Sequence, residues 1–320
     1  MADSQDRIAP PYRLIAKLLT QGKVVPFLGA GVNFGMRQKG EKWDDTTKNR
    51  LLPSGGELSH FLADEVNFPS TEDYERTDLA KVASYYTTMV KREELCEILT
   101  EVFDHDFVPC EIHKYLAEIA REGNPMLIVT TNYDDLLERA FDEANRPYCV
   151  VFYPTNKAWE GSVMLWKQGE SEPEPVKTNE LAGKINPEEM TVIYKMHGTV
   201  GRRFKSGYDS YVITEDDYVD FLVRMMSASS TPVPPAIQQY FHDRYFLFLG
   251  YGLRDWNLRV VLRSLENALP GHSSDPEERM AWAIQYQPSR LERKLWNKRD
   301  IEIFDVDIDE FVTGLRSRTK

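Results

Sequence analysis

The 320-residue sequence lacks the features that mark a membrane protein or a nucleic-acid-binding protein. No run approaches the roughly 18 consecutive apolar residues that a membrane-spanning helix needs. Residues 1–6 lack the basic and then apolar layout of a signal peptide, so we expect a cytoplasmic protein with no membrane partner. The formal net charge of −12 leaves no excess of Lys and Arg for a broad face that binds nucleic acid or anionic lipid directly.

The sequence is also poor in metal-ligand patterns. Its three cysteines, Cys96, Cys110 and Cys149, are widely spaced and form no C-x-x-C pair, which excludes a zinc ribbon. We read them as buried small hydrophobic residues and expect no disulfide. The cluster Asp104-His105-Asp106 follows the end of a predicted helix and has no further spaced ligand set. We therefore expect a solvated helix end there, and no bound metal.

What the chain does contain is typical of an α/β protein. Short apolar runs suited to buried strands alternate with segments whose apolar residues recur at helical spacing. This alternation predicts a Rossmann-like doubly wound parallel sheet of about six strands within one domain, residues 1–320. The runs occupy residues 23–28, 126–129, 148–152, 191–196, 245–249, 281–284 and 301–304.

Three other segments interrupt this alternation. Residues 54–122 form a block of helical patterns that opens with the capping box Ser54-x-x-Glu57, and we predict an inserted helical module whose apolar stripes face its core. The charged stretch 36–56 reads as a surface loop, either a mobile cover or a solvated connection. Residues 158–190 are rich in Glu, Pro, Gly, Lys and Asn with little to bury, which predicts a flexible surface insertion.

The stretch Thr130-Thr131-Asn132-Tyr133-Asp134 combines hydroxyls, an amide, a phenol and a carboxylate between a predicted strand and a predicted helix. In an open parallel sheet this is the carboxyl edge, where the first amides of the next helix are unpaired and the helix dipole is positive. Polar side chains at such an edge contribute little to packing, so packing alone does not explain them. We predict that this turn is half of an active site.

Three more strand ends carry glycine or polar functional residues. In Gly29-Ala30-Gly31-Val32-Asn33, small residues let the backbone turn tightly, with following amides free to meet a pyrophosphate, although a plain tight turn also fits. His197 sits between a strand and Gly198, and its alternative role is that of a satisfied core histidine. Gly250-Tyr251-Gly252 ends the most apolar strand. Because all four ends should open on the same edge, together they predict a nucleotide site.

Four short motifs resemble sirtuin-like domains, specifically the NAD-degrading proteins of bacterial antiphage defence. They are Gly29-Ala30-Gly31-Val32, Thr131-Asn132-Tyr133-Asp134, Met196-His197-Gly198 and Phe248-Leu249-Gly250-Tyr251, and they occur in the family's order. The resemblance covers residues 24–265. Each motif is short, but the four together are specific.

The resemblance implies roles for individual residues. Asn132 matches the asparagine that holds the nicotinamide ribose and positions a nucleophile, and Asp134 matches the acid that bonds the nicotinamide carboxamide. His197 matches the base that acts on a ribose hydroxyl or on water. The predicted catalytic residues are thus Asn132 and His197. The predicted NAD-contacting residues are Gly29, Ala30, Gly31, Val32, Asn33, Thr131, Asp134, Gly250, Tyr251 and Gly252.

Elementary chemistry agrees with these roles. Cleavage of the nicotinamide glycosidic bond leaves positive charge on the ribose, which the site must stabilise. An imidazole near its ordinary pKa can accept a proton at neutral pH, and an amide such as that of Asn132 can orient water. The chain lacks the four-cysteine zinc module of the deacylating sirtuins and a P-D-F-R segment after Val32. Hydrolysis of NAD+ to nicotinamide and ADP-ribose is therefore favoured. The alternatives are ADP-ribosyl transfer or deacylation, and a non-catalytic module that binds NAD+ or ADP-ribose.

The resemblance also implies a biological setting, in which NAD+ depletion aborts the infection of a cell by phage. The 320 residues contain no evident second domain for sensing infection. We therefore expect control by a homo-oligomer or by a separately encoded partner, such as an ATPase, a helicase or an Argonaute-like protein. In that scheme, activation closes or orders the 36–56 loop over NAD+.

Overall fold

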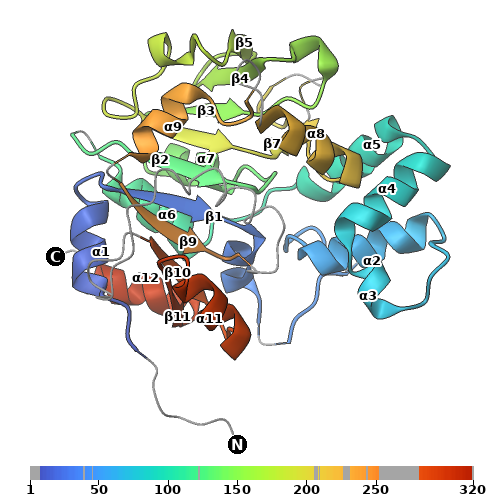
Figure 1. Cartoon of the computed structure of the whole chain (residues 1–320), viewed down its shortest axis with the longest axis horizontal. Helices are drawn as coiled ribbons and strands as arrows, with labels where there is room; N and C mark the ends of the chain where they lie inside the picture. The colour runs from blue at the N-terminus through green and yellow to red at the C-terminus, as the bar shows by residue number, and fades with distance from the viewer. Residues whose placement is uncertain are drawn as a thin grey trace, which may run out of the picture.

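A mostly parallel sheet lies at the centre of the computed structural model, which describes residues 8–318 except 39, 45, 122, 205–207, 209, 226–230, 243 and 252–280 (Figure 1). Within these residues the sheet has nine strands in the order β11-β10-β9-β1-β2-β6-β3-β4-β5. From β11 to β3, each strand pairs in parallel with its neighbours. β4 is antiparallel to both β3 and β5. The strands are β1 (Val24–Leu28), β2 (Leu127–Thr130), β3 (Tyr148–Phe152), β4 (Ser162–Lys167), β5 (Glu174–Lys177), β6 (Thr191–Lys195), β9 (Tyr245–Leu249), β10 (Ala281–Gln285) and β11 (Ile301–Asp305).

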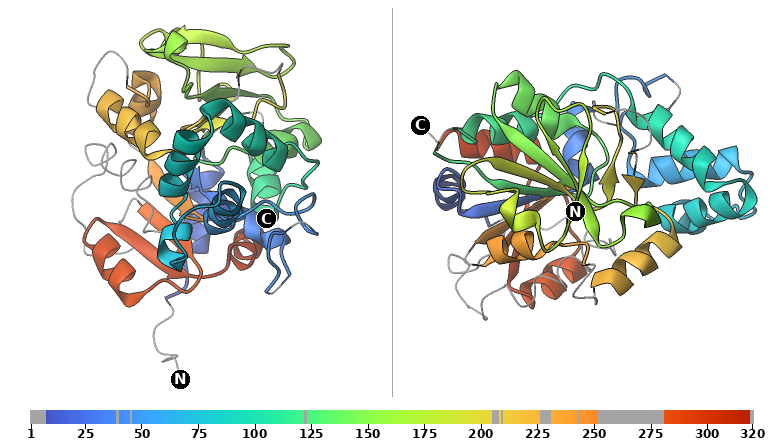
Figure 2. Two further views of the ribbon diagram at one scale, coloured as in Figure 1. Left: turned by 90° about the vertical axis from the view of Figure 1, so that its right-hand side faces the viewer. Right: turned by 90° about the horizontal axis from the view of Figure 1, so that it is seen from above.

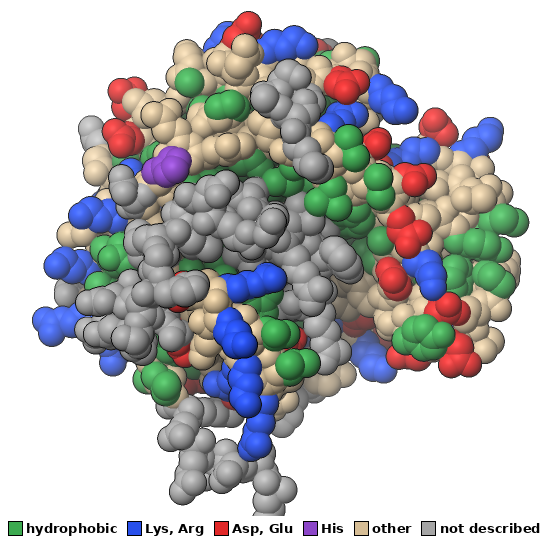
Figure 3. Space-filling model, viewed as in Figure 1, with side chains coloured by type: hydrophobic (Ala, Val, Ile, Leu, Met, Phe, Trp, Pro, Cys, Tyr) green, Lys and Arg blue, Asp and Glu red, His purple; other side chains and the backbone are tan. Residues whose placement is uncertain are grey.

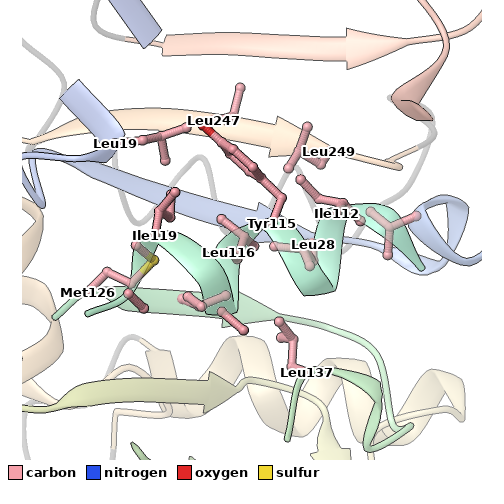
Figure 4. Close-up of a cluster of buried hydrophobic side chains, with 14 of the residues drawn as sticks. Leu19, Leu28, Ile112, Tyr115, Leu116, Ile119, Met126, Leu137, Leu247 and Leu249 are labelled. Atoms are coloured by element: carbon pink, nitrogen blue, oxygen red, sulfur yellow. The ribbon is translucent and has the colours of Figure 1, made fainter. Parts of the chain in front are cut away.

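Helices cover both faces of the sheet, which is why the parallel strands are apolar along their length. One face packs against α1 (Tyr12–Leu19), α6 (Glu111–Ile119), α7 (Leu136–Glu143) and α12 (Ile308–Arg316). Figure 4 shows part of this layer, where Tyr115 and Leu116 of α6 lie against Leu28, Leu247 and Leu249. The other face packs against α8 (Glu215–Met225), α9 (Pro235–Phe241) and α11 (Arg290–Asn297). The predicted doubly wound α/β fold is confirmed.

A third hydrophobic cluster belongs to the helices between β1 and β2. It is formed by α2 (Gly55–Glu65), α4 (Leu79–Met89) and α5 (Arg92–Phe103), with the short α3 (Asp73–Arg76) alongside. These helices lie at the end of the sheet toward which the parallel strands point (Figure 1 and Figure 2, right). The predicted capping box at Ser54 and Glu57 is present at the start of α2. The last helix of the 54–122 block, α6, packs on the sheet instead.

Two predictions about the sheet are wrong in detail. The strand number is nine rather than about six in the described part of the chain. The stretch 158–190 was expected to have little to bury, yet Ser162–Lys167 forms β4, in which Val163, Met164 and Leu165 are fully buried. This strand pairs with β3, and β5 covers its outer edge. The 158–190 stretch thus extends the sheet.

The surface carries both basic and acidic side chains, as the composition of the sequence suggests. Figure 3 shows basic and acidic side chains on the same face, with exposed apolar side chains over the helical module. No helix in the described residues is long and apolar enough to cross a membrane. Cys110 and Cys149 are buried, Cys96 is partly exposed, and none of the three forms a disulfide.

Candidate active site

The four strands that carry the predicted motifs are neighbours in the sheet, in the order β9-β1-β2-β6. Because they run in parallel, their carboxyl ends lie side by side. A pocket of about 130 Å³ at this edge is lined by residues from three of these ends: Ala30, Asn33, Thr131, Asn132, Tyr133, Asp134 and His197. The structure therefore brings both predicted catalytic residues, Asn132 and His197, to one pocket. Gly252 lies outside the described residues.

The turn after β1 is packed tightly against the end of β9. The amides of Gly29 and Gly31 donate to the carbonyls of Leu249 and Gly250, each over 2.9 Å. Gly250 has a φ of +68°, and a Cβ there would lie 2.3 Å from the Val32 nitrogen, so only glycine fits. Val32 N–H also donates within the turn, to Gly29 O. The prediction that the amides after β1 are free for a pyrophosphate is thus wrong for Gly29, Gly31 and Val32.

Hydrogen bonds tie Asn132 to the end of its own strand, β2, and to the end of β1. Its backbone N–H donates to Thr130 Oγ1 over 3.0 Å, and that hydroxyl donates to Leu28 O over 2.9 Å. The Asn132 Nδ2 donates to Gly29 O over 3.3 Å. Next to it, the Tyr251 hydroxyl donates to Leu28 O. The Asn132 amide group therefore has a defined orientation at the pocket wall.

Asp134 and Asn33 form a second polar pair in the pocket. The Asn33 Nδ2 donates to Asp134 Oδ2 over 3.0 Å, and Asp134 Oδ1 accepts from the Leu136 amide that opens α7. Burial raises the pKa of the Asp134 carboxyl, and the Lys195 ammonium only partly opposes this. The buried Asn33 Oδ1 has no hydrogen-bond partner among the described residues. An unpartnered acceptor beside a carboxylate is a ready site for the N–H groups of a ligand.

His197 is almost fully buried, with its ring edge-on to Tyr218 and Phe221 of α8. Burial lowers the pKa of this imidazole to about 3, although the nearby Asp217 carboxylate opposes the shift. The expectation of an imidazole near its ordinary pKa is therefore wrong. The ring is neutral across the physiological pH range, and it can orient a hydroxyl or water more readily than it can hold a proton.

The last part of the 36–56 segment forms one wall of the pocket. Leu52, Pro53, Ser54 and Gly55 line it, and Leu51 and Leu52 are buried, so the solvated-connection reading is wrong for this part. The Arg37 guanidinium donates to both oxygens of Glu57 at 2.8 and 2.7 Å, and also to Leu52 O. Burial would raise the pKa of Glu57, but hydrogen bonds from Arg37 and from the Ser54 and Trp43 amides lower it to about 2.

Sequence reasoning missed part of the lining and its support. Leu58, Leu79 and Phe103, which we assigned only to the core of the helical module, also line the pocket, as does Tyr218 of α8. Apolar periodicity does not distinguish a residue that faces the core from one at its rim. Lys195, a charged residue at the end of a buried strand, was a visible signal that we did not use.

A second cavity of about 570 Å³ adjoins the first, and Ala30 and Gly55 line both. It extends over the ends of β9, β10 and β11, where Gly31, Gly250 and Tyr251 meet Ile284, Tyr286 and Asp307. The predicted residues Gly250 and Tyr251 thus face this second cavity. Among the described residues, no group of three His, Cys, Asp or Glu side chains is arranged to hold a metal ion.

The family follows from comparison with known proteins. A family model described as the SIR2-like domain matches residues 126–304, more than half of the chain. The chain belongs to the SIR2-like domain family. The match contains the three motifs around Asn132, His197 and Gly250, and the sirtuin-like resemblance predicted from the motifs is confirmed.

Relatives of this SIR2-like chain include several bacterial proteins. The NAD(+) hydrolase ThsA of Enterococcus faecium is 26% identical over 252 residues, which cover 78% of this chain and 41% of that protein. ThsA of Bacillus cereus (strain MSX-D12) is 24% identical over 269 residues, 81% of this chain and 46% of that protein. Defense-associated sirtuin 2 of Bacillus subtilis is 22% identical over 297 residues, 91% of this chain and 24% of that protein. The chain spans less than half the length of each of these relatives.

Among solved structures, one from a study of the mechanism and regulation of Sir2 enzymes matches 96% of this chain and 97% of its own, with 13% identity and a TM-score of 0.45.

Proposed function

We propose that this SIR2-like chain hydrolyses NAD+ to nicotinamide and ADP-ribose. The observation that carries the proposal is the meeting of Asn132, Asp134 and His197 in one pocket at the carboxyl edge of the sheet. Relatives named NAD(+) hydrolase, which align with 78% and 81% of this chain, support the choice of substrate.

The two adjoining cavities suit the two halves of a dinucleotide. In our proposal the nicotinamide ribose occupies the pocket of Asn132 and His197, and the adenosine half occupies the larger cavity beside Gly250 and Tyr251. Ala30 and Gly55, at the junction, lie where the pyrophosphate would pass. The pocket of Asn132 and His197 has a volume of only about 130 Å³, so in our proposal residues 52–55 shift when the nicotinamide ribose enters it.

The polar pair at the pocket wall would hold the leaving group. The carboxamide N–H groups of nicotinamide would donate to the unpartnered Asn33 Oδ1 and to the Asp134 carboxyl. Fixing the carboxamide sets the plane of the ring relative to the ribose. This orientation favours breaking the bond between the ring nitrogen and C1′.

Hydrolysis then needs an oriented water and no strong base. The bond electrons leave with the ring nitrogen, which turns the pyridinium into neutral nicotinamide, while positive charge develops on the ribose. A water oriented by the Asn132 amide bonds to C1′ and releases one proton. The neutral His197 imidazole would orient the attacking water or a ribose hydroxyl through a hydrogen bond.

We further propose that the activity depletes NAD+ in antiphage defence, which the name Defense-associated sirtuin 2 of one relative supports. Control by homo-oligomer assembly, or by a separately encoded ATPase, helicase or Argonaute-like partner, stays part of this proposal.

Chromatography of NAD+ incubated with the protein, alone and with the product of its neighbouring gene, tests the proposed reaction. We expect nicotinamide and free ADP-ribose in equal amounts without any added acceptor. Radiolabel transferred from NAD+ to protein would instead identify an ADP-ribosyltransferase. Saturable NAD+ binding without release of nicotinamide under any condition would identify a binding module and overturn the proposal.

A further inference from the structure

Lys195 lies directly beneath the turn that carries Asn132 and Asp134. It is the last residue of β6 and, among the described lysines, the one that is buried. Its Nζ donates to Asp134 O over 2.5 Å, to Glu138 Oε1 over 2.9 Å and to Tyr133 O over 3.4 Å. These three acceptors use all three hydrogens of the ammonium group.

The position of this ammonium group is unfavourable for α7, the helix that follows the turn. It faces the N-terminal end of α7, where the helix dipole disfavours a cation. Both Lys195 and Glu138 are buried, so each loses its hydration, and a buried ion pair can often be exchanged for apolar side chains without loss of stability. Stability alone therefore does not account for a lysine at this place.

Glu138 interacts with two basic residues, with Lys195 through a hydrogen bond and with Arg203 through its charge. Its Oε1 accepts from Lys195, whereas its buried Oε2 has no hydrogen-bond partner among the described residues. A carboxylate that uses only one of its two oxygens contributes little to fixing the position of α7. It provides the counter-charge for the buried Lys195 side chain.

We propose that Lys195, neutralised by Glu138, is a positioning residue for the reaction. It holds the carbonyl of Asp134 and, together with the Val200 amide, that of Tyr133. With both carbonyls held, the side chains of Asn132 and Asp134 stay at the pocket wall. The catalytic part of this inference rests on the proposed NAD+ hydrolysis, whereas the claim that Lys195 holds the turn does not.

The test compares variants of the full chain that separate charge, packing and positioning. Lys195→Met with Glu138→Leu replaces the ion pair by apolar side chains of similar size. Glu138→Gln keeps an acceptor for Lys195 but removes the counter-charge. The control is Ile193→Val, which removes a methyl group from the same face of β6, two residues from Lys195. The measurements are the melting temperature, hydrogen exchange of a peptide covering residues 131–136, and kcat and KM for NAD+ under the conditions that activate the wild type.

We expect the double variant to fold, to exchange the 131–136 amides at least tenfold faster, and to lose about 100-fold in kcat with KM changed less than about threefold, since a displacement of about 1 Å costs that much in rate. Glu138→Gln should show smaller changes in the same direction, and Ile193→Val should show neither change. Unaltered exchange and kcat in the double variant would overturn the inference. If the double variant fails to fold, Glu138→Gln decides on the same two readouts.

The two proposals fail separately. If the wild type cleaves no NAD+ under any activating condition, the proposed function is lost, and the exchange measurement still decides whether Lys195 holds the turn. If the wild type cleaves NAD+ and kcat follows only the melting temperature across all variants, including Ile193→Val, then Lys195 has a structural role and the positioning proposal is wrong.

Discussion

The side-chain nitrogen of Asn33 lies 3.0 Å from the Asp134 carboxylate, which joins the turn after β1 to the turn after β2. The two residues are 101 positions apart, with the helices α2 to α6 between them. In the proposed reaction this pair receives the nicotinamide carboxamide. The first prediction therefore concerns Asn33.

Asn33→Leu removes the hydrogen bond to Asp134 while keeping the side-chain size. Because a buried polar group is left without its partner, we expect the free energy of unfolding to fall by about 1–3 kcal/mol. The KM for NAD+ should also rise, since the acceptor for the carboxamide is lost. Urea denaturation and steady-state kinetics measure the two effects.

The matched control is Asn124→Leu. Asn124 is also buried and donates to Ile119 O over 2.8 Å, away from the pocket. It should lose similar stability with no change in KM. Equal KM values for both variants would show that Asn33 has no part in substrate binding.

Gly250→Ala tests the packing of the two glycine turns. The new Cβ would lie 2.3 Å from the Val32 nitrogen at a φ of +68°. We expect a loss of about 1–3 kcal/mol in the free energy of unfolding and weaker NAD+ binding, because the turn after β1 must move. Gly183→Ala is the control, since its Cβ would meet nothing within 4 Å. Calorimetric titration under non-hydrolysing conditions compares the NAD+ affinities of the two variants. Equal affinities would contradict the packing argument.

Much of the fold and of the site could be predicted from the sequence. Parallel strands present their carboxyl ends at one edge, so the positions of Asn132 and His197 at neighbouring strand ends followed once the apolar runs were recognised. The cap at Ser54 is local and was visible as a pattern of four residues. Local rules and strand order were sufficient for these features.

Other features depend on contacts between distant residues. The strand Ser162–Lys167 was hidden because four apolar residues were averaged into a long polar stretch. The pairing of Lys195 with Glu138 crosses 57 positions, and no periodicity relates the two. The low pKa of His197 depends on burial by α8, which the sequence does not display.

Two buried histidines predict an acid-sensitive fold. Burial lowers the pKa of His113 to about 3, as it does that of His197. In the unfolded chain each imidazole binds a proton near pH 6.5, so below that pH the unfolded state binds more protons than the folded state. The free energy of unfolding should therefore be independent of these two imidazoles above about pH 6.5. As the pH falls from there toward 3, each imidazole should lower it by about 1.4 kcal/mol per pH unit. Denaturation of His197→Phe across this range should show a smaller slope, and an unchanged slope would contradict the assignment.

The contact of Arg37 with Glu57 and Leu52 predicts that residues 52–55, the cover of the pocket, can be loosened by a single substitution. Glu57→Gln removes the charge that holds the guanidinium, and with it part of the tie between Leu52 and the start of α2. Because the closed pocket is too small for the nicotinamide ribose and its ring, we expect NAD+ turnover without activation to rise roughly tenfold, equivalent to about 1.4 kcal/mol. Glu65→Gln, at the exposed end of the same helix, is the control. Equal turnover in the two variants would show that the cover does not limit access.

Single-turnover cleavage of NAD+ by the wild type and by Asn132→Ala tests the central claim most directly. Asn156→Ala, which removes the exposed cap of the 3₁₀ turn Lys157–Trp159 outside the pocket lining, serves as the control. The account predicts that the wild type and Asn156→Ala release nicotinamide at similar rates. Asn132→Ala, still folded, should be slower by a factor of about 100 or more. Equal rates for all three proteins would contradict it.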